Sequence, residues 1–233
     1  MKTNKKPICI IPARIGSKRI KFKNIKNFYG KPLIYYSIIE AKKSKLFSRI
    51  VVTTDSKKIA NIAKKYGAEV PFLRSKKLSN DKVGIKPVIC DCIKKLKSNN
   101  VKYHFIIYAT NPLIKASNLK KAFKKINKLK YKILIGVKKF DINPTKSIKI
   151  KKNKLVFSFS KKILGNSQNF DNFYYDDGSF AILDTKSYLK RKNWISKKTT
   201  YHIHKENESF DLNTKEDLNK LKKIYKLRFK PNN

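Results

Sequence analysis

Short apolar runs rich in β-branched residues alternate with amphipathic segments through the first 140 residues, and this alternation restricts the fold more than any other feature of the chain. Each run has the length of a buried strand, and the segment after it repeats apolar residues with the helical period. Units of this kind build a mostly parallel sheet covered by helices. The sequence therefore predicts an α/β sandwich. The expected strands are 8–11, 50–54, 70–73, 105–108, 133–137, 179–183 and 200–204.

Helix boundaries are predicted from residues whose backbone or side-chain chemistry favours a helix end. Proline fits the first turn, a serine or threonine side chain can cap the free N–H groups, and glycine permits the turn that ends a helix. A threonine with an acidic residue three positions later resembles a capping box. The expected markers are Pro32, Ser56 with Gly67, a helix over 87–96, Ser117, and Thr214 with Asp217.

The hydrophobic period changes to two between Thr145 and Phe159. Lys152 and Asn153 separate two short apolar stretches there, which is typical of a β-hairpin. A chain of 233 residues is long enough to bury one substantial core. We therefore expect residues 1–233 to form a single domain with a small appendage at about residues 140–175.

Cysteine content and hydropathy indicate a cytoplasmic protein. Cys9, Cys90 and Cys92 are the three cysteines, an odd number without metal-ligand spacing, so neither a disulfide framework nor a zinc site is indicated. No apolar run approaches the roughly 18 residues of a membrane span, and none resembles a signal peptide.

The formal net charge of +43 raises the question of nucleic-acid binding, because fields of lysine and arginine attract phosphate backbones. The lysines are spread over nearly every predicted helix, together with many asparagines and isoleucines, and do not form one stripe. This distribution indicates compositional bias and argues against a specific nucleic-acid site. An RNA-binding module that uses the same positive field remains the alternative from another class of protein.

A basic loop directly follows the first predicted strand. In open α/β sheets, ligands bind at the carboxyl ends of the strands, where loop N–H groups can meet anions. Arginine can bind a phosphate through two hydrogen bonds, and lysine acts as a point charge. The loop is predicted to neutralise a triphosphate, although its cations are also consistent with an ordinary lysine-rich surface. It carries Arg14, Gly16, Ser17, Lys18, Arg19, Lys21 and Lys23.

Seven segments carry a resemblance to a known family. They read IPARIGSKRIKFKNI, GKPLIYYSI, IVVTTD, KKYGAEVPFLR, YATNPLI, YYDDGSF and FDLNTKEDL. In order and spacing the chain resembles the acylneuraminate cytidylyltransferases over essentially its whole length. The resemblance implies a Rossmann-like nucleotidyltransferase sandwich with a small β-rich dimerisation element, and hence a homodimer. It also implies an Mg²⁺-dependent enzyme of surface-glycan biosynthesis that joins CMP from CTP to the anomeric hydroxyl of a nine-carbon 2-keto sugar acid and releases pyrophosphate.

The same resemblance implies roles for individual residues. Arg14 and Lys18 would hold the phosphates and stabilise transition-state charge, which suits a reaction dominated by positioning and electrostatics. Asp55 is consistent with two roles, as a structural cap or as a residue that contacts the ligand. The residues expected to bind CTP are Pro12, Ala13, Arg14, Gly16, Ser17, Lys18, Lys23, Asn24 and Asp81.

Two segments bear on the sugar. YATNPL and YYDDG are similar to the pseudaminic-acid branch, so we expect pseudaminic acid, with N-acetylneuraminic or legionaminic acid as the alternatives and the eight-carbon acid Kdo disfavoured. Tyr108 is also consistent with a structural role, as an aromatic residue at the end of a strand that packs under a helix. The residues expected at the sugar are Tyr108, Thr110, Asp176 and Gly178.

Metal binding is expected at Asp211 and Asn213, where the family usually has two carboxylates. Oxygen ligands suit Mg²⁺, so one carboxylate and one amide oxygen are a workable pair. Asn213 is also consistent with a turn residue before the last helix. Other departures from the family pattern are Ile15, Gly84 with Ile85, and Asn166 in place of an arginine near Lys161 and Lys162. The sequence indicates no carboxylate or cysteine partner for His104, His202 or His204, so the three histidines are predicted to be structural. Phe180 and Trp194 are predicted to pack in the core.

Overall fold

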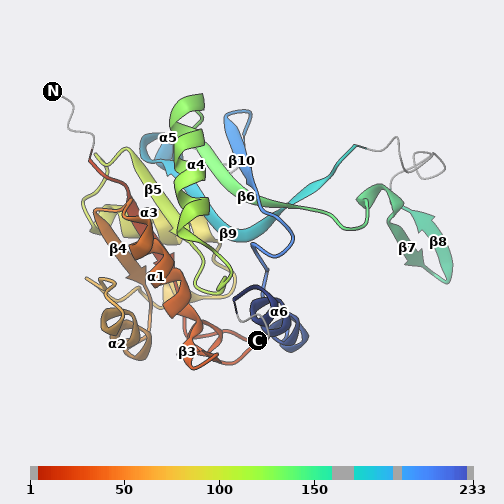
Figure 1. The fold of residues 1–233 in the computed structure, drawn as a ribbon, viewed down its shortest axis with the longest axis horizontal. Helices are drawn as coiled ribbons and strands as arrows, with labels where there is room; N and C mark the ends of the chain where they lie inside the picture. Colours follow the sequence, from red (N-terminus) through yellow and green to blue (C-terminus); the bar gives the residue numbers. More distant parts are fainter. Residues whose placement is uncertain (1–4, 159–170, 191–195, 230–233) are drawn as a thin grey trace.

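A computed structural model describes residues 5–158, 171–190 and 196–229 of the chain. Within these residues, one sheet of six strands forms the centre of the molecule (Figure 1). Its order is β10 (Thr199–Ile203), β6 (Ile133–Lys139), β9 (Tyr174–Asp184), β5 (Tyr103–Ile107), β1 (Ile8–Pro12) and β4 (Arg49–Thr53). β1 runs parallel to β4 and β5, and β10 runs parallel to β6. β9 is antiparallel to both of its neighbours, so the sheet is mostly parallel, as predicted.

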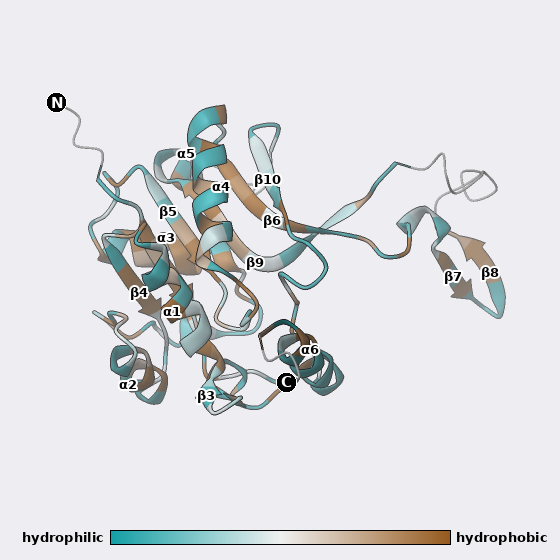
Figure 2. Ribbon diagram, viewed as in Figure 1, coloured by the Kyte–Doolittle hydropathy of each residue, from teal (hydrophilic) through white to brown (hydrophobic). Residues whose placement is uncertain are grey.

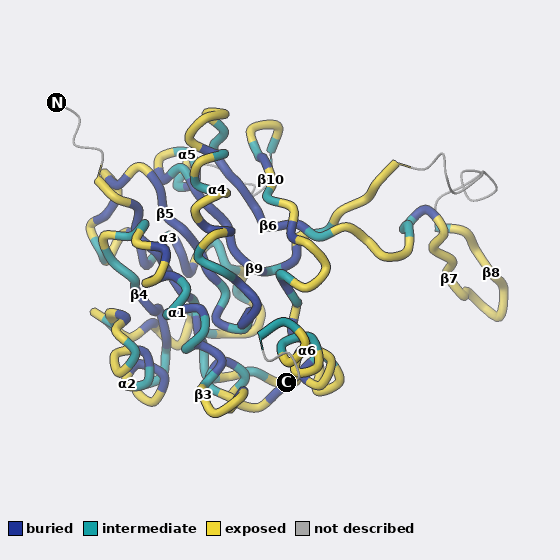
Figure 3. The backbone as a smooth tube through the Cα atoms, in the orientation of Figure 1, coloured by how far each residue is buried: buried dark blue, intermediate teal, exposed yellow. Residues whose placement is uncertain are grey.

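Helices cover both faces of this sheet, which confirms the predicted sandwich. In β1, Cys9 and Ile11 face one apolar core while Ile8 and Ile10 face the other, as the alternation of side chains along a strand requires. The first core is closed by α1 (Leu33–Ser44), α2 (Lys57–Lys65) and α4 (Ala116–Leu129). The second is closed by α3 (Ile85–Lys95) and α5 (Thr185–Lys190). In Figure 2 the strands β4 and β6 of the sheet are brown, hence apolar, and most of their length is dark blue, hence buried, in Figure 3.

The C-terminal helix α6 (Lys215–Phe229) packs on a third, smaller core below the sheet. Leu218 and Leu221 of α6 meet Ile20 and Phe28 there, so this core joins the end of the chain to the basic loop after β1. The short segments η1 (Lys23–Ile25), β2 (Asn27–Phe28) and β3 (Lys31–Pro32) lie in the same region. No helix among the described residues is both long and apolar enough to cross a membrane.

Most predicted helix boundaries are present with their caps. Pro32 precedes α1. The N–H of Ile59 donates to Ser56 Oγ at 3.4 Å at the start of α2. At α6 the N–H of Asp217 donates to Thr214 Oγ1 at 3.1 Å, and the N–H of Thr214 donates to Asp217 Oδ2 at 2.8 Å. The reciprocal pair is the capping box that the spacing predicted.

Two local predictions were wrong. Residues 70–73 do not form a strand, because only isolated bridges from Glu69 to Val51 and from Leu73 to Thr54 reach the sheet edge. Ser117 does not cap α4, which begins one residue earlier; the N–H of Ala116 instead donates to Glu40 Oε2 at 2.9 Å. A carboxylate from α1 therefore replaces the local cap that the sequence pattern indicated.

The predicted hairpin lies away from the sandwich, at the end of two long strand extensions (Figure 1). It consists of β7 (Ile148–Lys151) and β8 (Lys154–Phe157), preceded by η3 (Pro144–Lys146). Lys152 and Asn153 form its turn with φ of 48° and 58°. Positive φ at both central residues is characteristic of the tight turn that matches strand twist.

Candidate active site

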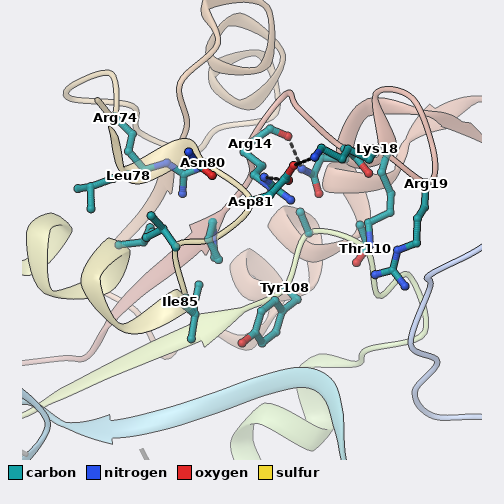
Figure 4. A pocket seen from close by; sticks show the side chains of 18 of the residues that line it. Arg14, Lys18, Arg19, Arg74, Leu78, Asn80, Asp81, Ile85, Tyr108 and Thr110 are labelled. Carbon is teal, nitrogen blue, oxygen red and sulfur yellow. Dashed lines mark hydrogen bonds and ion pairs between the residues drawn. The ribbon is translucent and has the colours of Figure 1, made fainter. Parts of the chain in front are cut away.

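A cavity of about 470 Å³ opens at the carboxyl ends of β1 and β5 (Figure 4). Its wall combines the basic loop after β1 (residues 13–24), the segment from Arg74 to Val88 and the residues that follow β5. This is the edge of the sheet at which ligands bind in open α/β folds. The predicted residues that line it are Pro12, Arg14, Ser17, Lys18, Lys23, Asn24, Asp81, Tyr108, Thr110 and Asn213.

The basic loop is held in shape by hydrogen bonds from its backbone and from Asn24. The N–H of Ala13 donates to Thr53 O at 3.0 Å, and the N–H of Ile15 donates to Asp55 Oδ1 at 3.0 Å. Asn24 donates through Nδ2 to Arg14 O at 2.7 Å. Asp55 thus supports the loop, so it has the structural one of the two roles predicted for it. The side chain of Ile15 packs against the core, so an apolar residue is suited to that position.

Arg14 and Lys18 converge on one carboxylate within the cavity (Figure 4). Arg14 Nη1 forms an ion pair with Asp81 Oδ1, and Lys18 Nζ lies 2.8 Å from Asp81 Oδ2. The hydrogen bonds from Lys18 and then from Arg14 lower the pKa of Asp81 below its usual value. The two cations that were predicted to bind phosphate are therefore already directed at a common anion.

Arg74 is a basic residue in the cavity wall that the predicted set of site residues lacked. It is only 6% exposed, and Nε donates to Ser79 Oγ at 3.0 Å. Within the described part of the chain its guanidinium has no salt bridge to a carboxylate, and burial lowers its pKa. A buried cation without an anionic partner suits an anionic or strongly polar ligand. Its place at the end of the KKYGAEVPFLR segment was the available sequence signal.

The predicted sugar-binding residues occupy two neighbouring places. Tyr108 and Thr110 line the cavity, and burial raises the pKa of the Tyr108 hydroxyl. Asp176 and Gly178 lie outside the wall, in an irregular part of β9. The charge of Asp176 adds to the increase in the pKa of Tyr108. Burial, followed by the neighbouring Asp177 and Asp211, raises the pKa of Asp176.

Asp211 and Asn213 lie side by side before α6, but their oxygens do not converge. Asn213 donates through Nδ2 to Asp211 Oδ2 at 2.6 Å, and its Oδ1 accepts from Arg19 Nη2 at 2.7 Å. Lys23 Nζ donates to Leu212 O at 2.7 Å, and burial lowers the pKa of Lys23 despite the nearby Asp211. Asn213 must rotate before its amide oxygen can join Asp211 around one cation. Among the described residues, no group of three acidic, histidine or cysteine side chains could hold a metal by itself.

Of the remaining predicted residues, Ala13 and Gly16 do not belong to the cavity wall. Ala13 is buried in the first core, and Gly16 stands in the basic loop. Gly84 precedes α3 and provides no side-chain cap. Gly84 and Ile85, which were noted above as departures from the family pattern, both line the cavity. Predictions for Lys161, Lys162, Asn166 and Trp194 lie outside the described residues.

The cytidylyltransferase family model matches residues 8–233. The chain belongs to this family. A cytidylyltransferase assignment agrees with the basic loop, with the cavity at the carboxyl ends of the parallel strands, and with the sequence resemblance. Enzymes of this family generally use a divalent metal ion.

Two curated cytidylyltransferase relatives match over nearly the whole chain. A pseudaminic acid cytidylyltransferase of Campylobacter jejuni is 36% identical over 225 residues, which cover 95% of this chain and 97% of that protein. A CMP-N,N'-diacetyllegionaminic acid synthase of Legionella pneumophila is 32% identical over 225 residues, covering 94% and 96%. Both relatives are named for nonulosonic acids.

Solved structures extend the agreement to the fold. A CMP-2-keto-3-deoxy-manno-octonic acid synthetase in complex with CTP superposes with a TM-score of 0.69, covering 96% of this chain and all of that one at 13% identity. A 4-diphosphocytidyl-2C-methyl-D-erythritol synthase from Anaerococcus prevotii superposes with a TM-score of 0.65, covering 97% of each chain at 14% identity. The α/β nucleotidyltransferase fold is therefore shared across distant cytidylyltransferases.

Proposed function

We propose that the chain transfers CMP from CTP to the anomeric hydroxyl of pseudaminic acid. The observation that carries this proposal is the similarity to the Campylobacter jejuni enzyme over nearly the full length of both chains. The similarity to the legionaminic acid enzyme makes legionaminic acid the second candidate substrate, followed by N-acetylneuraminic acid. The cavity and its cations support a triphosphate as the other substrate.

In this reaction the anomeric oxygen attacks the α-phosphorus of CTP. A new phosphorus–oxygen bond forms, the bond to the β-phosphate oxygen breaks, the hydroxyl proton is released and pyrophosphate leaves. Negative charge accumulates on the phosphate oxygens, and fixed cations stabilise such charge best when they are preorganised. Arg14 and Lys18 fill this role in the proposal, because both already point at one anion in the cavity.

We assign Asp211 as the protein ligand for Mg²⁺. One carboxylate suffices, because Mg²⁺ is commonly bound by one or two carboxylates together with substrate phosphates and water. Asp211 lies beside the cavity residue Asn213. Burial and then the neighbouring carboxylates of Asp177 and Asp211 raise the pKa of the nearby Asp176, so the acidic groups here lie close enough to interact. A bound Mg²⁺ would supply charge neutralisation on the phosphates. Asn213 would offer its amide oxygen as a second oxygen ligand, in place of its present hydrogen bond with Arg19.

Asp81 competes with CTP for the two phosphate-binding cations. Asp81→Asn removes the charge that now pairs with Arg14 and Lys18, so we expect CTP without Mg²⁺ to bind about threefold to tenfold more tightly. Isothermal titration calorimetry of the two proteins measures this change. Weaker binding by Asp81→Asn would instead support Asp81 as a direct CTP ligand, which is the role that the resemblance implied.

Substrate choice is tested by pyrophosphate release from CTP and Mg²⁺ with each sugar acid offered separately. We expect kcat/KM to be highest with pseudaminic acid, followed by legionaminic and N-acetylneuraminic acids. Highest activity with another of the three acids would retain the reaction and overturn the use of Tyr108 and Asp176 as markers of the pseudaminic branch. No release with any of them, from folded protein, would overturn the proposed reaction.

We propose that two copies of the chain associate through the hairpin. Cross-strand pairing places Ile148 opposite Phe157 and Ile150 opposite Leu155, so these four apolar side chains share one face. All four are exposed, Ile150 by 77%. An isolated two-stranded hairpin is marginally stable in water, so an apolar face of this kind needs a partner surface.

The hairpin proposal predicts the effect of a charge on that face. Ile150→Lys should convert a dimer to a monomer, because an unpaired charge would be buried at the contact. Sedimentation velocity measures the change in mass. Lys149→Glu, on the opposite face of the same strand, is the control and should remain dimeric. A monomeric unsubstituted protein would contradict the proposal.

We place the reaction in the cytoplasm. Cys9 and Cys92 are buried free thiols and Cys90 is a partly exposed one, which is consistent with a reducing compartment.

A further inference from the structure

A chain of buried polar side chains lies behind the predicted sugar-binding turn of β9. Asp177 Oδ1 accepts from Ser179 Oγ at 2.5 Å, and Ser179 Oγ lies 3.1 Å from His204 Nε2. On the other side of the ring, Asn118 Nδ2 lies 3.3 Å from His204 Nδ1 and donates to Glu208 Oε2 at 3.2 Å. We call Asp177, Ser179, His204, Asn118 and Glu208 the buried polar cluster. The prediction that His204 lacks a carboxylate partner was wrong, because Asp177 Oδ2 lies 3.7 Å from Nε2.

The cluster occupies space that the backbone leaves free for it. A Cβ atom on Gly136 of β6 would lie 2.2 Å from Ser179 Oγ, 2.8 Å from Asp177 Oδ1 and 3.2 Å from His204 Nε2. The pairing of β6 with β9 also shifts register between Ile135 and Val137, on either side of Gly136. Gly136 and the irregular stretch of β9 are thus built around these three side chains.

The hydrogen-bond partners select one tautomer of His204. The side-chain nitrogen of Asn118 can only donate, and its orientation is set by the acceptor Glu208 Oε2. Nδ1 of His204 must therefore accept, which leaves the proton of the neutral ring on Nε2, directed at Ser179 Oγ and Asp177 Oδ2. Burial lowers the pKa of His204 and favours the neutral ring. The charged and titratable groups that face it are Asp177 of β9, His202 of β10, Glu208 after β10 and Arg228 of α6.

The cluster reaches the predicted site through the backbone of β9. The N–H of Tyr108, in the cavity wall, donates to Ser179 O at 3.0 Å. The N–H of Gly178, which has φ of 59°, donates to Asp176 Oδ1 at 3.1 Å. A Cβ atom on Gly178 would lie 3.7 Å from Asp211 Oδ1, so this turn also adjoins the proposed metal ligand. Movement of Ser179 or Asp177 would displace all of these groups.

We propose that His204 is a positioning residue for the sugar-acid side of the site. Its Nε2–H tautomer holds Ser179 and Asp177 so that the turn of β9 presents Asp176 and Gly178 between Tyr108 and Asp211. This inference rests on the proposed function for its kinetic test. A serine hydrolase triad does not explain the cluster, because Ser179 is fully buried and Asp177 accepts from the serine itself.

The kinetic test compares two buried histidines. His104 of β5 has hydroxyl partners on both ring nitrogens, Ser98 Oγ at 3.0 Å and Thr185 Oγ1 at 2.8 Å, which makes it a matched control for the loss of a buried imidazole. We expect His204→Leu to raise KM for the sugar acid about tenfold, because the turn of β9 would no longer hold its binding groups in place. KM for CTP should stay within about twofold. His104→Leu should lower the Tm and leave both KM values unchanged. His204→Gln should recover most of the loss, because its amide nitrogen can replace Nε2–H.

A structural readout separates this inference from the proposed function. In ¹H–¹⁵N correlation spectra of the imidazole rings, we expect His204 of the unliganded protein to show the neutral Nε2–H tautomer. Replacement of His204 by Leu should shift the amide signals of residues 176–179 without shifting those of the basic loop, and His204→Gln should return them toward their original positions. An Nδ1–H tautomer, unshifted 176–179 signals, or equal increases in both KM values would overturn the inference. Inactivity of the unsubstituted protein with every sugar acid would refute only the proposed function.

Discussion

Arg14→Ala will lower kcat/KM for CMP transfer by about 100-fold to 1000-fold while the protein stays folded. The guanidinium stands in the cavity wall and pairs with Asp81, and removal of a preorganised donor at developing negative charge has effects of this size. Stability should change little, because the side chain is one-third exposed and its one other hydrogen bond, to Ser79 O, is long at 3.4 Å. Pyrophosphate release under saturating and limiting CTP measures the effect.

Lys21→Ala is the matched control for Arg14→Ala. Lys21 belongs to the same basic loop, but its ammonium lies over the ring of Phe22 and it does not line the cavity. The control should keep kcat/KM within about twofold of the unsubstituted enzyme, as expected for an exposed cation. Equal losses in both variants would mean that the net charge of the loop matters and that the position of Arg14 does not.

Asp211→Ala will raise the Mg²⁺ concentration for half-maximal activity by more than about tenfold and reduce kcat by about 100-fold. The substitution removes the carboxylate assigned to the metal, and Mg²⁺ binds through few protein ligands, so each counts heavily. Asn213→Asp should act in the opposite direction and lower the half-saturating Mg²⁺ concentration, because a second carboxylate replaces an amide that now turns its nitrogen toward Asp211. Activity as a function of Mg²⁺ measures both variants.

Glu216→Ala controls for the loss of negative charge near the start of α6. Glu216 is an exposed carboxylate in the first turn of that helix, close in sequence to Asp211. Its removal should leave the Mg²⁺ dependence unchanged. An unaltered Mg²⁺ dependence in Asp211→Ala as well would place the metal ligand elsewhere.

Much of the fold follows from local patterns that tertiary contacts do not override. The period-two alternation of Ile8 to Ile11 assigns each side chain to one of the two cores, and the Thr214–Asp217 spacing forms the capping box it predicts. The two wrong predictions arose where contacts with distant residues decide the local structure. Glu40 of α1 reaches the start of α4 in place of Ser117, and residues 70–73 touch the sheet only at isolated points.

The site was less predictable than the fold because its contacts join segments far apart in the chain. The resemblance directed attention to Arg14 and Lys18, but the pairing of both with Asp81 depends on how two loops fold together. The contact between Arg19 and Asn213 spans 194 positions and has no local signature. No partner for His204 is evident from the sequence for the same reason: Asp177 lies in β9, whereas His204 follows the end of β10.

The transfer of isotopic label from CTP to pseudaminic acid tests the central claim most directly. With [α-³²P]CTP, Mg²⁺ and pseudaminic acid, we predict that label enters an ester of the sugar acid in one-to-one ratio with the pyrophosphate released, whereas [γ-³²P]CTP labels pyrophosphate alone. Label from the γ-position in the sugar would identify a kinase, and pyrophosphate without labelled sugar would identify CTP hydrolysis; either result would contradict the account.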